Sequence, residues 1–185
     1  MTPATYNRQP VTAIVNQLVT NLAALKITIG NAAPTPAFAR VALFDSENLV
    51  AAFQQLLISE QRICLVVVLD EQFKTENRGQ VLISTRELPV TLLISDRQLG
   101  DRVAALYGNA ATPGAYGLME LALPVVTGML LAPPNGVTSE PIRNSVLIVK
   151  NEKDKQNLPG RSAVALELHC RGGNLQAPLG PQPVL

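Results

Sequence analysis

The side chains that could perform chemistry in this sequence are few, and His169 beside Cys170 is the first pair to consider. A histidine next to a cysteine suggests a nucleophile with its general base. Residues 162–170 alternate like a strand, however, so the two side chains should point to opposite faces of a sheet. We therefore interpret His169 as a surface residue beside Glu167 and expect no catalytic residue here.

Metal binding is the second chemistry to consider, because the sequence contains cysteine, histidine and acidic residues. A metal site needs several such ligands converging on one point. The only histidine and the two cysteines, Cys64 and Cys170, show no recognisable spacing, and Asp70–Glu71 is an isolated acidic pair. We expect no metal and interpret both cysteines as buried free thiols. A disulfide between them would require two neighbouring strands of suitable geometry.

A glycine-rich segment, residues 109–117 (NAATPGAYG), invites comparison with a phosphate-binding loop. Such a loop follows a strand and ends in Gly-Lys-Ser/Thr, whereas this segment follows a predicted helix and contains no lysine or arginine. The sequence also lacks the glycine fingerprints of dinucleotide-binding folds and of serine hydrolases. We expect no nucleotide and no other cofactor, and we attribute these glycines to a helix end and a tight turn.

Two groups of charged residues remain as candidates for contacts with other proteins. In the first, Arg97 and Asp101 are four positions apart on a predicted helix, where they should pair on the exposed side. Two carboxylates on one helical turn could also be catalytic, but a solvated or inter-subunit row of charges is the preferred interpretation. The second group surrounds a charged loop, residues 151–161, with a net charge of about +2. The predicted interface residues are Arg97, Asp101, Arg102, Lys150, Lys153, Asp154, Lys155 and Arg161.

The bulk composition favours one domain and weighs against nucleic acid as a main partner. The chain has 185 residues, of which 47% are hydrophobic and 16% charged, with a formal net charge of +1. A nearly neutral chain offers little attraction for a phosphate backbone. We expect no sequence-specific nucleic acid, no membrane partner and no secretory signal. Residues 1–171 are predicted to form one α/β domain, and residues 172–185, rich in proline and glycine, an extended arm.

The elements that position these residues indicate an α/β (α+β) fold. We predict a single mixed, mostly antiparallel sheet with helices packed against it and a long C-terminal β-hairpin. Apolar spacing predicts a helix from Val11 to Leu25 and a second helix after Ser46. Residues 40–44 are a short strand, and residues 62–69 are apolar throughout, which is typical of a strand covered on both faces.

The middle and end of the chain complete the prediction. We expect a turn at 70–79, a hairpin of strands 80–86 and 88–95, and a helix from Ser95 or Asp96 to Tyr107. The apolar helix after the glycine-rich segment should kink or restart at Pro124. Its apolar residues surround most of the helix, so it should lie in the core or against another subunit. Strands 142–150 and 162–170 form the last hairpin.

The segment from Glu87 to Leu131 resembles the corresponding part of tail-terminator proteins of tailed phages. The resemblance rests on RELPVTLLISDRQLGDRVAALYG followed by TPGAYGLMELALPVVTGMLL, with a turn at residues 114–117 and closing residues Gly128 and Leu130. It extends over about residues 11–170. Pro124 and the end of the chain after Arg171 depart from the family pattern.

The resemblance implies a non-enzymatic virion protein, located at the tail or neck and assembled in the host cytoplasm. Its expected form is a homo-hexameric ring that caps the tail tube, stops tube polymerisation and joins tail to head. The implied partners are other copies, the tail-tube protein, a head-side connector or neck protein, and the tail sheath. Repeated around a ring, the charged loop 151–161 would suit docking, although a solvated hairpin loop explains it equally well. A neck or head-completion adaptor, a tail-tube-like subunit, and an enzyme or ligand-binding protein remain alternatives.

Overall fold

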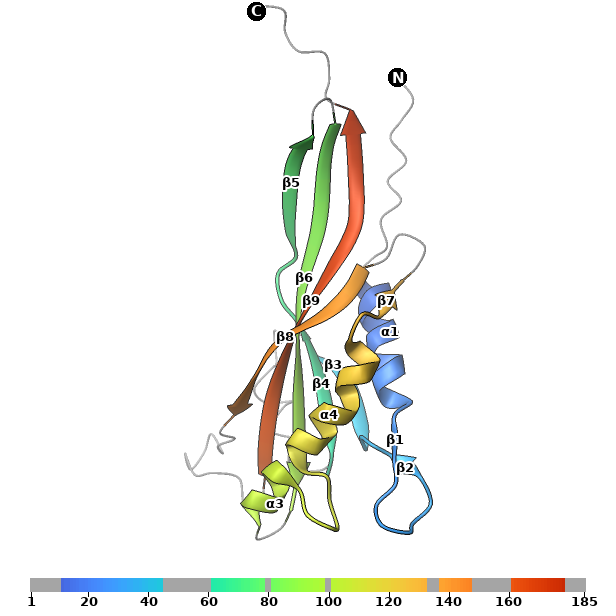
Figure 1. Ribbon diagram of the computed structural model, residues 1–185, viewed down its shortest axis with the longest axis vertical. Coiled ribbons are helices and arrows are strands. Elements are labelled where there is room, and N and C mark those ends of the chain that lie inside the picture. Colours follow the sequence, from blue (N-terminus) through green and yellow to red (C-terminus); the bar gives the residue numbers. More distant parts are fainter. Residues whose placement is uncertain are drawn as a thin grey trace, which may run out of the picture.

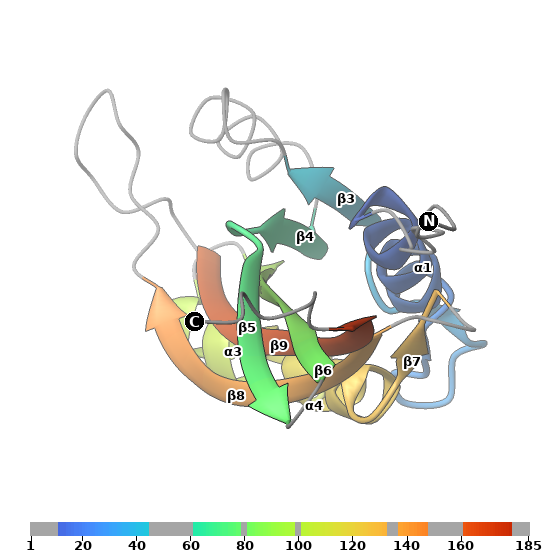
Figure 2. The same cartoon turned by 90° about the horizontal axis from the view of Figure 1, so that it is seen from above.

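The computed structural model describes residues 11–44, 61–78, 81–98, 101–132, 137–147 and 161–178. A curled seven-stranded sheet has the order β3-β4-β6-β9-β8-β7, with β5 paired to β6 (Figures 1 and 2). Among the described strands only β3 and β4 pair in parallel, so the predicted fold class is confirmed. The bounds of the sheet strands are β3 Arg40–Phe44, β4 Ile63–Val68, β5 Gln72–Arg78, β6 Val81–Arg97, β7 Leu130–Leu131, β8 Val137–Leu147 and β9 Arg161–Pro178.

Three helices, α1 Val11–Ala23, α3 Arg102–Tyr107 and α4 Gly114–Val126, accompany this sheet in the described residues. A separate pair of two-residue strands, β1 Lys26–Ile27 and β2 Thr35–Pro36, follows α1. The first helix is as predicted, because its apolar residues recur at helical spacing and are buried. Its buried side chains, together with those of α4, cover one face of β4, β6 and β9 and form the main core. The predicted second helix after Ser46 lies outside the described residues.

β4 is covered on both faces, as its continuous apolar sequence predicted. The side chains from Ile63 to Val66 are fully buried although successive residues point to opposite faces. β4 lies between β3 and β6, so both of its edges are hydrogen-bonded. The predicted arrangement of this strand is confirmed.

The predicted hairpin of strands 80–86 and 88–95 is wrong, because these residues form one strand, β6, of 17 residues. Pro89 suggested a break, since it has no N–H to donate. In the structure the Pro89 carbonyl accepts from the Leu69 N–H at 3.0 Å, where the chain passes from β4 to β5. The proline nitrogen faces that same edge, so the β6–β9 ladder on the other edge loses no hydrogen bond.

The predicted turn at residues 70–79 is also wrong over most of its length. Gln72–Arg78 is a strand, β5, that pairs with residues 81–87 of β6, with Arg78 opposite Val81. Together with residues 171–178 of β9, these segments form a three-stranded extension that we call the projecting ribbon. Figure 1 shows the projecting ribbon extending past the ends of α1 and α4. The described helices therefore cover the body of the sheet and do not extend over the ribbon.

The segment after β6 differs from its prediction in where the helices begin. Ser95, Asp96 and Arg97 belong to β6, and α3 begins only at Arg102. Asp101 caps α3 by accepting from the Ala104 N–H at 2.8 Å, and Gly108 ends it with φ 82°. The next helix, α4, begins at Gly114, inside the segment predicted to be a turn. Pro124 lies within α4, which continues to Val126 instead of starting anew.

The C-terminal hairpin is confirmed, with β8 paired antiparallel to β9. β9 continues to Pro178, so residues 172–178 of the predicted arm are a strand paired with residues 81–86 of β6. Sheet pairing supplies the hydrogen bonds that a glycine- and proline-rich sequence does not suggest. The division of the chain into one domain and an arm stays a prediction. Within the described residues, the helices are too short or too polar to span a membrane.

Candidate protein-interaction surface

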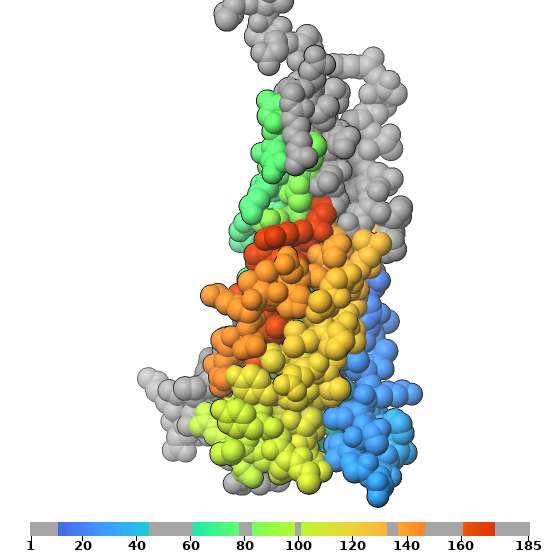
Figure 3. Space-filling view, viewed as in Figure 1, coloured from blue at the N-terminus to red at the C-terminus, as the bar shows by residue number. Residues whose placement is uncertain are grey.

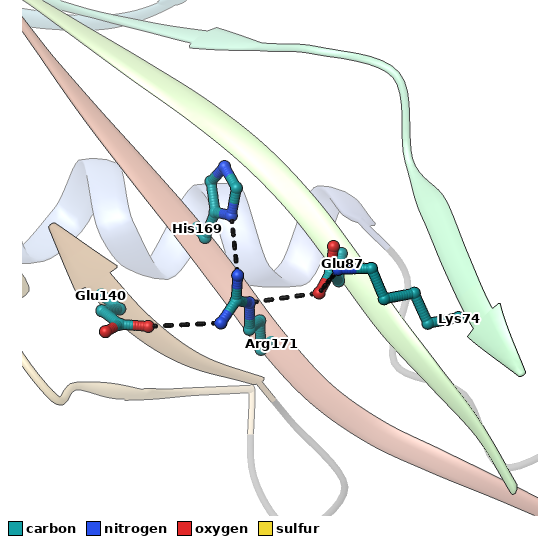
Figure 4. Close-up of polar contacts among 5 residues, drawn as sticks. All are labelled: Lys74, Glu87, Glu140, His169 and Arg171. Atoms are coloured by element: carbon teal, nitrogen blue, oxygen red, sulfur yellow. Dashed lines mark hydrogen bonds and ion pairs between the residues drawn. The ribbon is translucent and has the colours of Figure 1, made fainter. Parts of the chain in front are cut away.

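A cluster of five charged or polar side chains spans four strands at the base of the projecting ribbon (Figure 4). Glu87 of β6 lies at its centre and contacts Lys74 of β5 at 2.8 Å and Arg171 of β9 at 3.2 Å. Arg171 also approaches Glu140 of β8 at 3.6 Å and donates to Nδ1 of His169 at 3.3 Å. A guanidinium can only donate, so the imidazole accepts at Nδ1. We call these five residues the ribbon-base cluster.

The electrostatics of this cluster favour an ionised Glu87. Its side chain is only 10% exposed, whereas that of Lys74 is 65% and that of Glu140 is 61% exposed. The hydrogen bond from Lys74 is the main reason that the pKa of Glu87 lies below its ordinary value, with the charge of Arg171 adding to it. The centre of the cluster is thus neutralised internally, and its outer members present charge at the surface.

The charges continue along the same face of the sheet. Arg143 of β8 contacts Glu167 of β9 at 2.8 Å, which raises the pKa of Arg143. Glu167 and His169 alternate with the buried residues of β9, as the strand pattern in the sequence predicted, and Arg171 continues the same alternation. Between residues 167 and 171 of β9, the sheet therefore has an apolar face on the side of α1 and α4 and a charged face on the opposite side.

The opposite side of β6 carries one more ion pair near the ribbon base, between Arg86 and Glu71. Arg86 is buried, and its positive charge acts to lower the pKa of the nearby Cys170 thiol, whereas burial raises that pKa. The ion pair with this buried guanidinium holds residue 71 in place immediately before β5. The ribbon base is consequently held by ion pairs on both faces.

The glycine-rich elbow after α3 is anchored by Asp96, a fully buried carboxylate at the end of β6. The Thr112 hydroxyl and the Gly114 N–H donate to Oδ2 of Asp96, the latter at 3.2 Å, and the Arg97 N–H donates to Oδ1 at 2.7 Å. Burial raises the pKa of Asp96, and these hydrogen bonds act against that shift. The carboxylate thereby ties the start of α4 to the sheet.

Two glycines make this elbow possible. Gly108 and Gly114 have φ values of 82° and 68°, which favour glycine. A Cβ on Gly114 would lie 2.3 Å from the Gly108 nitrogen, and one on Gly108 would lie 2.3 Å from the Pro113 carbonyl oxygen. The interpretation of Gly108 as a helix end is confirmed. Gly114 begins α4 and Gly117 lies within it, so the predicted tight turn does not include these two glycines. Close backbone contact is an additional reason for glycine at positions 108 and 114.

An apolar patch lies next to the elbow, on α3 and α4. Val103 and Tyr107, one helical turn apart, are 68% and 66% exposed. The Tyr107 ring stacks on Tyr116 of α4 with 5.7 Å between ring centroids. Figure 3 shows α3, α4 and β8 together on one face of the molecule. Large exposed apolar side chains on adjacent helices are typical of surfaces that contact other proteins.

The first group of predicted interface residues is only partly in the expected setting. Asp101 and Arg102 are exposed at the start of α3. Arg97 is on β6, so it does not share a helix with Asp101 and the predicted four-residue pairing on one helix is wrong. The apolar run before residue 95 continues as strand through the charged residues, because Arg97 pairs with Arg161 in the β6–β9 ladder.

The second group divides at the edge of the described residues. Lys150, Lys153, Asp154 and Lys155 lie outside them. Arg161 is 1% exposed, and its guanidinium donates to the Ser95 hydroxyl at 3.2 Å and to the Gln61 carbonyl at 3.5 Å. Burial lowers the pKa of Arg161 to about 10. In the isolated chain Arg161 is therefore a structural residue of the sheet and is not available as a surface contact.

The cysteines are free and buried in the described structure, as predicted. Burial raises the pKa of Cys64 and raises that of Cys170 to about 12, so both are neutral thiols at physiological pH. No group of three or more potential metal ligands occurs among the residues that the structure describes. The arrangement of the described residues offers recognition by charge pairs and apolar contacts.

Sequence reasoning missed the ribbon-base cluster, of which it had considered only His169. Lys74 and Glu87 belonged to segments predicted to be a turn and a strand break. The available signal was Gly79 followed by Gln80 between two segments that can alternate, which is a typical two-residue hairpin connection. With that hairpin in place, Lys74 and Glu87 fall on one face of adjacent strands.

Comparison with known proteins finds distant structural likeness only. No protein-family model matches the sequence, and no curated protein matches it. A chain in a solved structure described as the virion of a native gene transfer agent particle is similar to this chain, with 10% identity and a TM-score of 0.41. The similarity covers 88% of this chain and 93% of that chain. A likeness of this size carries no argument about family or function.

Proposed function

We propose that this chain is a structural protein of a phage-like virion, and specifically a tail terminator. In this proposal six copies form a ring that caps the tail tube, stops its polymerisation and joins it to the head-side connector. The mechanism is steric and electrostatic: the ring matches the last layer of the tube without offering another growing surface. The protein then acts through binding surfaces and catalyses no reaction.

The sequence support for the proposal is the resemblance in residues 87–131. In the structure this stretch is the second half of β6, the elbow and the helices α3 and α4, in the expected order. The segment also contributes the apolar patch of Val103, Tyr107 and Tyr116. A ring subunit needs such side chains, because each copy buries surface against two neighbours.

The structural observation that carries the proposal is the projecting ribbon with charged residues at its base. Its β5 strand exposes every side chain from Gln72 to Asn77, and Lys74, Glu140 and Arg171 of the ribbon-base cluster remain 45 to 65% exposed. A protrusion without helical cover gives the molecule reach, and exposed charges of both signs favour docking in one orientation. We propose the ribbon as a contact with the tube or the connector.

The predicted interface residues keep a role in this proposal. Asp101 and Arg102 lie next to the apolar patch and would contact a neighbouring copy. Lys150, Lys153, Asp154 and Lys155 would form the docking loop, with Arg161 supporting its base and Arg97 beside it in the ladder. The end of the chain beyond Pro178 would reach a neighbouring subunit. The tail sheath is an additional partner for tails that have one.

Inactivation of the gene tests the proposal and separates its alternatives. Loss of a tail terminator should give tubes of excess and variable length together with unjoined heads, seen by negative-stain electron microscopy. Tubes of normal length that fail to join heads would instead identify a neck or head-completion adaptor. Complete loss of tubes would identify a tube subunit, and particles of normal form and yield would contradict a virion role.

The ring itself is tested on the purified chain. Native mass spectrometry, alone and with the purified tail-tube protein, should detect an assembly with six times the mass of the chain. Assembly only in the presence of the tube protein would agree with a ring that closes on its template. A strict monomer under both conditions would contradict the ring.

A further inference from the structure

β5 is an edge strand in which Lys74 and Glu76, of opposite charge, flank Thr75. It pairs with β6 along its whole length, and no other strand of the described residues pairs with it. Its side chains from Gln72 to Asn77 are exposed on both faces. An edge strand presents backbone N–H and C=O groups that can pair with a further strand, so natural edges usually carry features that select or prevent pairing.

We propose that β5 pairs antiparallel with β5 of a second copy around a two-fold axis at Thr75. In this register Thr75 lies opposite itself, and Lys74 lies opposite Glu76 of the second copy. The two-fold axis repeats the Lys74–Glu76 contact, so the pairing contains two opposite-charge pairs on one face. Such cross-strand pairs stabilise antiparallel strands, and like charges directly opposite each other destabilise them.

The charges select this register over its neighbours. A slip of two residues in one direction places Lys74 opposite its own copy, and a slip in the other direction places Glu76 opposite its own copy. Slips of one residue are excluded for a continuous sheet with this symmetry, because they bring opposite faces together. The order Lys-Thr-Glu is therefore self-complementary in a single two-fold register.

Lys74 belongs both to the ribbon-base cluster and to the proposed contact. Lys74 is 65% exposed although it binds Glu87 at 2.8 Å, so its ammonium group can donate to a second carboxylate from the solvent side. The charged row would then continue from Arg171 and Glu87 through Lys74 to Glu76 of the second copy. The occupant that this edge fits is thus another copy of the same chain.

The contact goes beyond the proposed ring. A two-fold contact uses the same strand of both copies and closes with two members, whereas a ring requires a contact between different surfaces that repeats around its axis. A single strand pair buries less than a standard interface, so we expect association that is weak in solution and favoured at high protein concentration.

Cysteine trapping tests the pairing in the full-length protein. In the Thr75→Cys variant the two Cα atoms of residue 75 should be about 4.5 to 5.5 Å apart, within the range that a disulfide can span. Cys64 and Cys170 are buried, so the thiol introduced at position 75 is the exposed one. Oxidised glutathione should convert this variant to a disulfide-linked dimer on non-reducing gels.

The matched control is Asn77→Cys on the same exposed strand. Its Cα would lie about 14 Å from its copy in the proposed register, too far for a disulfide. We expect at least about ten-fold less linked dimer from Asn77→Cys than from Thr75→Cys, because only the latter lies on the axis. Equal linkage of both variants, or none in either, would overturn the proposal.

A charge variant provides the second measurement. Adding Glu76→Lys to Thr75→Cys places Lys74 opposite the newly introduced lysine twice, so dimer formation should decrease severalfold, most strongly at low salt. Adding Glu120→Lys, an exposed substitution on α4, should leave it unchanged. Circular dichroism of each variant establishes that it is folded. Undiminished linkage in the Glu76→Lys variant would contradict the charge-selected register.

Discussion

At the scale of single residues, the elbow between α3 and α4 shows how backbone contact can require glycine. Gly108 and Gly114 have positive φ values, and the backbone around each of them leaves no room for a Cβ. Gly30 also has a positive φ value, 61°, but a Cβ there would meet no atom within 4 Å. The chain therefore contains a matched pair of sites in which conformation and crowding can be separated.

We predict that Gly114→Ala destabilises the protein far more than Gly30→Ala. The Gly30 substitution should cost roughly 1 kcal/mol in the free energy of unfolding, since only the left-handed conformation opposes it. Gly114→Ala adds a Cβ 2.3 Å from the Gly108 nitrogen, so its cost should exceed about 3 kcal/mol. Urea unfolding followed by circular dichroism measures both values. Equal costs would mean that the elbow relaxes without loss of packing.

Two carboxylates should give the unfolding free energy opposite dependences on pH. The pKa of Glu87 is lowered from 4.5, so its contribution is present above pH 4.5 and is lost as the pH falls through the folded value. The pKa of Asp96 is raised from 3.8, so its contribution is complete below pH 3.8 and is lost as the pH rises through the folded value.

In the Glu87→Gln variant the free energy of unfolding should therefore decrease less as the pH falls. In the Asp96→Asn variant it should decrease more steeply as the pH falls. Urea midpoints between pH 3 and pH 6 for the wild type and both variants provide the comparison. The two variants serve as controls for each other, because they change the slope in opposite directions. A change of slope in the same direction would contradict the assigned charge states.

At the scale of elements, β6 shows what local sequence could and could not predict. A run of apolar residues identified strands at residues 88–95 and in β4, helical spacing identified α1, and alternation identified the two faces of β9. Glu87 and Pro89 suggested a break because an isolated strand tolerates neither well. In the structure, residues distant in sequence accommodate both. Lys74 and Arg171 neutralise the charge of Glu87. The edge of β6 at Pro89, which lacks an N–H, faces the point where the chain passes from β4 to β5.

The candidate surface was less predictable than the fold for the same reason. Charged residues give no periodic signal of their partners, so the ribbon-base cluster becomes visible only when the strand register is known. Arg161 illustrates the opposite error. A charged residue beside a polar loop predicts exposure, yet this one is buried beside Ser95 in the β6–β9 ladder. The partners of the cluster residues and the burial of Arg161 both depend on pairing between strands that are distant in the sequence.

Hydrogen exchange should distinguish the two halves of β6. Residues 90–95 pair with β4 and β9 and lie on the core, whereas residues 81–84 pair with β5 and β9 in the projecting ribbon. Both halves have strands on each side, so the difference is the apolar cover. We expect amide protection in the ribbon to be at least about ten-fold lower, because the described helices do not pack on it. Equal protection would show that ribbon and body open as one cooperative unit.

At the scale of the whole molecule, the described core residues belong to the body, whereas β5 of the ribbon exposes its described side chains from Gln72 to Asn77. The main cluster of buried apolar residues lies between the sheet and the helices α1 and α4, while β5 of the ribbon exposes mostly polar side chains. This division fits a protein that is stabilised in one part and makes contacts with another. The proposed ring contact at the apolar patch of α3 and α4 and the proposed β5 pairing use different surfaces, so each of these two can fail without the other. Docking of the ribbon on the tube or connector would use the same strand as the β5 pairing.

The continuity of β6 and β9 has a mechanical consequence. Both strands run without interruption from the core to the ribbon, so a push on the tip is transmitted as torque through covalent backbone into the body. The β6–β9 ladder shifts register between Ser84 and Arg86, close to the base of the ribbon. Bending should concentrate at this irregularity. We therefore expect the ribbon to move relative to the body by bending at the register shift.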